Sequence, residues 1–282
     1  MRARGFTLIE MIIVITITGI IASIVAVFMR APVQGYADAA RRAHLTDTAD
    51  TTLRRIARDV QSALPNSLRP NAACVANTTT LCGIELLPTL TGGRYRQDDA
   101  CFSTGCTTLT SLGSVIAANG EHSGRRIAIY NLHNNDGANC ASLNPSAWCG
   151  QNVATVIAST DSSNNDQFNF AATTFAPGTG SPSRSFFIVG GPVAYVCSNV
   201  GTIGDNGTGE LRRYENYMAA STPTLPPASA SGQLIARNVS ACNINYAPAV
   251  SGTDGLLQIY LEITEAGETA GLYHEVHVDT AP

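Results

Sequence analysis

The cysteines are the residues in this sequence with the clearest chemistry. All of them lie beyond residue 70, and an even number in such a region is typical of disulfides formed in an oxidising compartment. No Cys-x-x-Cys pair occurs and no histidine stands beside them at zinc spacing, so disulfides are favoured over a metal site. Other connectivities remain open, but sequential pairing would close three short loops and one longer one. The expected pairs are Cys74–Cys82, Cys101–Cys106, Cys140–Cys149 and Cys197–Cys242.

Glu10 is the second residue with a chemical meaning, because it is the only ionisable side chain between Phe6 and Met29. As an α-helix this apolar run would be about 36 Å long, enough to cross a hydrocarbon core of about 30 Å. A carboxylate inside a membrane-spanning segment costs about 2.5 to 3.5 kcal/mol on insertion scales, so such a group usually has a partner. The alternative is that Glu10 reaches the interface by itself, because it lies near the end of the helix.

The residues before the run indicate its orientation. Arg2 and Arg4 would stay on the cytoplasmic side, which places the rest of the chain in the periplasm as a single-pass inner-membrane protein. An ordinary secretory signal peptide needs a shorter apolar core followed by a small-x-small cleavage site. Ala22, Ser23 and Ala26 lie inside the run, so this alternative is disfavoured.

Catalytic and cofactor-binding patterns are missing from the sequence. It has no Gly-x-Ser-x-Gly elbow, no His-Glu-x-x-His and no glycine-rich phosphate loop after a strand, so we expect no enzyme, no catalytic residues and no cofactor. Asp161 to Asp166 is rich in oxygen ligands but lacks the EF-hand glycine and distal glutamate, so we interpret it as a solvated turn and expect no metal. The formal charge of −4 argues against a nucleic-acid partner.

The elements that position these residues follow from periodicity. After Met29, apolar residues from Tyr36 to Leu64 recur mostly at steps of three and four, which predicts one helix from Phe6 to Leu64 with a possible kink near Pro32. A sheet must cover its apolar stripe, which includes Tyr36, Ala40 and Ala43. Residues 30–66 are thus an amphipathic continuation of the 6–29 segment, and residues 67–282 form a globular β-rich domain.

Alternation and turn signals predict strands in this domain. From Asn71 to Gly124 we expect loops held by disulfides and edge structure, and from Gly201 to Gly209 a turn between two strands with Asn206-Gly207 at its tip. The expected strands cover residues 83–87, 125–132, 153–158, 167–171, 185–189, 192–198, 210–214, 233–239, 257–263 and 272–278. The fold class is α+β, a long N-terminal helix packed against antiparallel sheets.

The string Gly5-Phe6-Thr7-Leu8-Ile9-Glu10 ahead of a long apolar run resembles the leader of type IV prepilins and type II secretion pseudopilins. The resemblance implies that residues 1–5 are a leader peptide, and that prepilin peptidase cuts between Gly5 and Phe6 and methylates the new amine. It also implies that Glu10 pairs with the amino terminus of a neighbouring subunit during assembly.

Residues 31–67 and the C-terminal 272–278 are similar to MshO-type minor pilins of mannose-sensitive haemagglutinin (MSHA) pili, which are similar to J-type pseudopilins. This resemblance implies initiation of pilus assembly, near the tip, by a subunit carried into a cell-surface pilus. The implied partners are other minor pilins, the major pilin, prepilin peptidase and an inner-membrane assembly platform. The alternatives are a tip adhesin or DNA-uptake minor pilin, with exposed loops around Cys74 to Cys106 or Trp148 as its binding surface, and a type II secretion pseudopilin.

Overall fold

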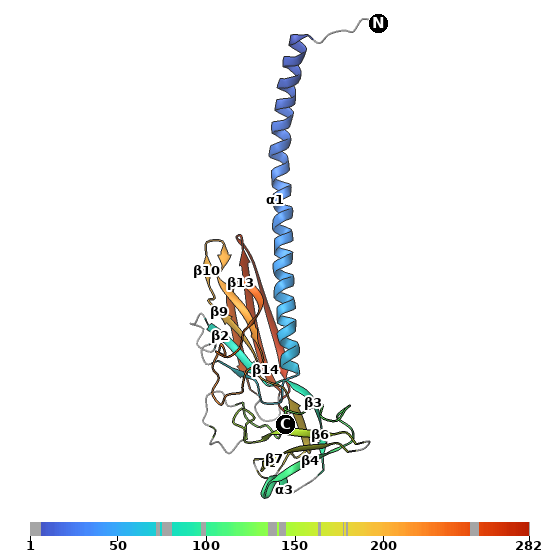
Figure 1. Ribbon diagram of the computed structural model, residues 1–282. Helices are drawn as coiled ribbons and strands as arrows, with labels where there is room; N and C mark the ends of the chain where they lie inside the picture. The colour runs from blue at the N-terminus through green and yellow to red at the C-terminus, as the bar shows by residue number, and fades with distance from the viewer. Residues whose placement is uncertain are drawn as a thin grey trace, which may run out of the picture.

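A computed structural model describes residues 7–71, 74, 81–96, 100–134, 140, 145–162, 165–176, 178, 180–248 and 254–281. Its first element is the helix α1 (Leu8–Gln61), which runs for 54 residues with Pro32 inside it. The N-terminal half of α1 stands clear of the rest of the molecule, and the helix stays continuous throughout (Figure 1). It ends before the expected Leu64 because the Leu64 amide donates to the carbonyl of Leu87, 2.7 Å away, instead of continuing the helical pattern.

The C-terminal half of α1 has one buried stripe. Its members recur at steps of three and four residues: Leu45, Ala49, Leu53, Ile56 and Val60. Burial of each large aliphatic side chain contributes about 1.5 to 3 kcal/mol. The stripe is shorter than expected, since Tyr36 is 79% exposed, and Ala40 and Ala43 are also exposed. The covering sheet ends near Arg42, whose Nη2 atom lies 2.7 Å from an Oε2 atom of Glu268.

The stripe packs on a seven-stranded antiparallel sheet with the order β1-β2-β9-β12-β13-β14-β15. Its strands are β1 (Arg69–Pro70), β2 (Leu81–Leu86), β9 (Val193–Ser198), β12 (Gly209–Tyr214), β13 (Gln233–Ala247), β14 (Gly255–Glu265) and β15 (Glu268–Val278). In β14 the side chains of Leu257, Ile259, Leu261 and Ile263 are buried between less buried neighbours. This alternation is the pattern of a sheet with one face against the core.

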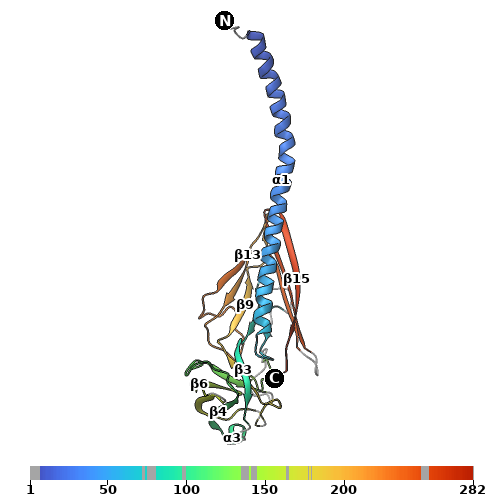
Figure 2. The same cartoon turned by 90° about the vertical axis from the view of Figure 1, so that its right-hand side faces the viewer.

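The remaining large strands form a closed barrel in the order β3-β4-β7-β6-β5-β8. They are β3 (Thr89–Tyr95), β4 (Cys106–Leu112), β5 (Arg126–Ile129), β6 (Val153–Thr160), β7 (Gln167–Thr173) and β8 (Ser185–Val189), with the short helix α3 (Ala100–Ser103) before β4. The barrel lies beyond the C-terminal end of α1, far from the N-terminal end of this helix (Figure 2). Its core is aromatic, with Phe168, Phe175 and Phe186 fully buried.

Two expectations about local structure are wrong in part. The stretch from Asn71 to Gly124, expected to be loops and edge structure apart from the strand at 83–87 (β2), also contains β3 and β4. Thr-rich β3 and β4 have weak apolar alternation, and their pairing in the barrel makes them strands. The expected turn between Gly201 and Gly209 is present as a hairpin of β10 (Thr202–Ile203) and β11 (Asn206–Gly207), but its tip is Gly204-Asp205 and not Asn206-Gly207.

Four disulfides hold these elements. Three close short loops, Cys74–Cys82, Cys101–Cys106 and Cys140–Cys149. The fourth, Cys197–Cys242, joins β9 to β13 across a sequence separation of 45 residues. Each disulfide restricts the unfolded chain and contributes about 2 to 4 kcal/mol on a chain-entropy account.

Candidate assembly site

Glu10 lies in the first turn of α1, where it forms a reciprocal cap with Thr7. The Thr7 amide and hydroxyl donate to Glu10 Oε2 at 3.0 and 2.9 Å, and the Glu10 amide donates to Thr7 Oγ1 at 3.3 Å. A carboxylate in the first turn also interacts favourably with the positive end of the helix dipole. Among the described residues, none bonds to Glu10 Oε1, so this oxygen is not used in the cap.

The surface around Glu10 is apolar and uncovered. Side chains from Leu8 to Met29 are exposed throughout, with Leu8 at 78% and Phe28 at 76%. An apolar surface of this extent favours contact with lipid or with other helices. By length and composition, α1 is able to cross a membrane.

The other expected site residues are placed as follows. Gly5 and Phe6 lie outside the described residues. Within the described ranges, no group of three or more His, Cys, Asp and Glu side chains is arranged to hold a metal ion. The expected solvated turn at Asp161 to Asp166 is wrong for Asp166, which is fully buried, and the amides of Val115, Ile116 and Ser162 donate to its carboxylate.

Residues 1–26 match the family model for the prokaryotic N-terminal methylation motif. This motif supports a type IV pilin or pseudopilin type of protein that is anchored in a membrane and assembles with other pilins. The motif marks a structural rather than a catalytic family, so it offers no support for enzyme activity. The comparisons with curated proteins and with solved structures found no match.

A buried polar network, which no sequence motif marks, connects the sheet to the barrel. Arg69 donates through Nε to Glu85 Oε2 at 2.8 Å, and the two side chains are 0% and 3% exposed. The Arg69 guanidinium lies 3.6 Å from the ring centroid of Trp148, and the hydroxyl of Tyr217 donates to Glu85 Oε1 at 2.8 Å. Arg69 also donates to the carbonyls of residues 220 and 221.

Trp148 belongs to this network and is therefore not part of an exposed binding loop. It is 4% exposed, and its indole Nε1 donates to the Ser67 carbonyl at 2.8 Å. The idea that Trp148 provides a binding surface is wrong, because its ring is covered by Arg69 and packs in a core between sheet and barrel.

Proposed function

We propose that this protein is a minor pilin that helps to initiate an MSHA-type type IV pilus, near its tip, after cleavage between Gly5 and Phe6 and methylation of the Phe6 amine. The β-rich part lies in the periplasm before assembly, and the apolar half of α1 holds the subunit in the inner membrane. The observation that carries this proposal is an exposed apolar helix with a single carboxylate, Glu10, at its start.

The chemistry of assembly follows from the position of Glu10. Glu10 follows Phe6 by four positions, about 6 Å along a helix, so the amine and the carboxylate of one subunit are about one helical turn apart. A neighbouring helix displaced along the filament axis can bring its amine to Glu10 Oε1, which is not used in the cap. At an effective dielectric constant of about 20, two charges at 4 Å attract by about 4 kcal/mol.

Glu10 could matter for its part in the N-terminal cap of α1 and not for charge pairing between subunits, and the two roles can be tested separately. Glu10→Gln removes the charge but keeps a side chain able to form the capping box, whereas Thr7→Ala removes the cap and keeps the charge. In cells that assemble the pilus, we expect filament incorporation of Glu10→Gln to fall at least about tenfold and that of Thr7→Ala to stay near the wild-type level.

The two variants also need a check of processing. Mass spectrometry of each full chain should show N-methyl-Phe6 at the amino terminus, and an intact Met1 would refute the processing step. Equal incorporation of Glu10→Gln and wild type would reject charge pairing, and a loss in Thr7→Ala alone would assign Glu10 to the cap.

A further inference from the structure

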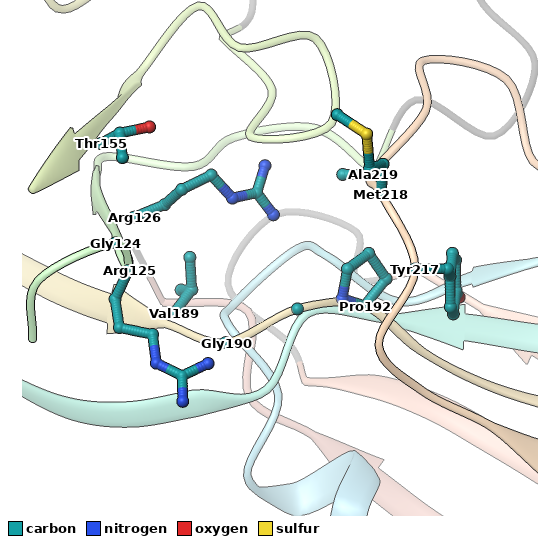
Figure 3. A pocket seen from close by; sticks show the side chains of 11 residues that line it. Gly124, Arg125, Arg126, Thr155, Val189, Gly190, Pro192, Tyr217, Met218 and Ala219 are labelled. Atoms are coloured by element: carbon teal, nitrogen blue, oxygen red, sulfur yellow. The ribbon is translucent and has the colours of Figure 1, made fainter. Parts of the chain in front are cut away.

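A cavity of about 340 Å³ lies where the barrel meets the segment after β12. One wall comes from the barrel, with Arg126 on β5, Thr155 on β6 and Val189 on β8, and the facing wall comes from Tyr217 and Met218 (Figure 3). Cavities of about 300 to 1,000 Å³ are the usual size of small-molecule sites. The cavity lies beyond the C-terminal end of α1, away from the exposed N-terminal half of the helix that carries Glu10.

Arg126 is the residue that gives this cavity its chemistry. Its side chain is half-buried and extends into the space between the two walls (Figure 3); Nη2 is covered by the protein and has no hydrogen-bond partner among the described residues. Burial lowers the pKa of Arg126. A half-buried guanidinium with no carboxylate partner is favourable for an anion that enters the space beside it, because the anion would offset the cost of burying the charge.

The charge of the cavity is of one sign. Arg125 is a second cation in the lining, and the lining contains no carboxylate from the described part of the chain. Glycines at positions 124, 190 and 191 keep side chains away from the space beside the two arginines. An anionic group beside Arg126 therefore meets no competing acid among the described lining residues, and Arg125, whose side chain extends to the other side of Val189 (Figure 3), adds a second positive charge nearby.

The wall opposite Arg126 is held in place before any ligand arrives. The hydroxyl of Tyr217 donates to Glu85, and Arg69 donates to the carbonyls of Ala220 and Ser221 at 2.7 and 2.9 Å. Because these bonds belong to the buried network between sheet and barrel, the wall does not have to order on binding. A preorganised wall reduces the entropic cost of binding a small ligand.

We propose that this cavity binds the carboxylate of a small organic acid of about monosaccharide size, with Arg126 as the main anchor. The accessible N–H groups of the Arg126 guanidinium offer charged donors to a carboxylate oxygen. The side chains of Val189, Pro192 and Met218 provide apolar contacts for the carbon skeleton. A polyanion such as a nucleic acid is disfavoured, because the chain carries a formal charge of −4.

The test is calorimetric titration of the full chain in detergent with glucuronate, with glucose as the neutral control and inorganic phosphate as the competing anion. We expect saturable binding of glucuronate and none of glucose. Arg126→Gln should weaken glucuronate binding at least about tenfold, because it removes a charged hydrogen-bond donor. Arg237→Gln is the matched control, since it removes an exposed arginine of β13 outside the lining and should leave binding unchanged.

Stability provides a second readout. Without ligand, Arg126→Gln should be at least as stable as wild type, because the substitution removes an uncompensated charge. The proposal is overturned if glucuronate does not bind, if only phosphate binds, or if Arg126→Gln and Arg237→Gln bind glucuronate as wild type does. A loss of stability in Arg126→Gln would show that Arg126 already has a partner within the chain, which also overturns the proposal.

Discussion

Replacement of Glu85 by glutamine should destabilise the protein far more than loss of an exposed ion pair does. In the wild type, Glu85 Oε2 lies 2.6 Å from Arg69 Nη2, and both side chains are almost fully buried. The substitution leaves the Arg69 charge buried without a counter-charge. Breaking a buried pair in this way costs about 3 to 5 kcal/mol. Because glutamine keeps one acceptor, we expect the free energy of unfolding to fall by about 3 kcal/mol, the lower end of this range.

This loss can be measured by urea unfolding of the full chain in detergent. The protein has a single tryptophan, Trp148, whose ring lies under the Arg69 guanidinium, so its fluorescence reports on the network directly. For a folded region of about 150 to 250 residues, 1 kcal/mol shifts Tm by about 2 to 4 °C, so Tm should fall by about 6 to 12 °C.

Two control variants separate charge burial from other effects. Glu210→Gln breaks the same type of pair with Arg212, but both side chains are 35% exposed, and the expected cost is at most about 1 kcal/mol. The double variant Arg69→Met/Glu85→Leu replaces the pair by apolar groups and should recover most of the stability lost in Glu85→Gln. A cost below about 1 kcal/mol for Glu85→Gln, or a double variant no more stable than Glu85→Gln, would refute the reasoning.

Two further predictions concern the barrel and the disulfides. Burial raises the pKa of Asp166, but three backbone amides that donate to the carboxylate outweigh it and hold the pKa below its usual value. The stabilisation is therefore present above about pH 4 and lost as the pH falls through the folded-state pKa. Asp166→Asn should be about 1 to 3 kcal/mol less stable than wild type at pH 7, and this difference should shrink in acid. A constant difference between about pH 7 and about pH 2 in urea titrations would contradict this. Thiol labelling of the native exported protein should find no reactive cysteine, and labelling of several before reduction would show that the four disulfides do not all form.

Local pattern was enough to predict the helix and the C-terminal hairpin. The apolar run with Glu10 has a composition that requires a helix in lipid, and the spacing from Leu45 to Val60 marks one helical face. β14 and β15 are consecutive in the chain and pair with each other, for example at Leu257 and Val276. The alternation of apolar and polar residues along each strand was therefore sufficient to predict this hairpin. These features depend on neighbours within a few residues or on the solvent around them.

Tertiary structure alone decided the barrel and the sites at its junction with the sheet. β3 and β4 are rich in threonine and become strands because the barrel closes around Phe168 and Phe186. The network around Arg69 joins it to carbonyls more than 150 residues later, and Arg126 faces a wall formed by Tyr217. No local pattern encodes such pairings, because burial and charge at each position depend on which distant segments the fold brings together.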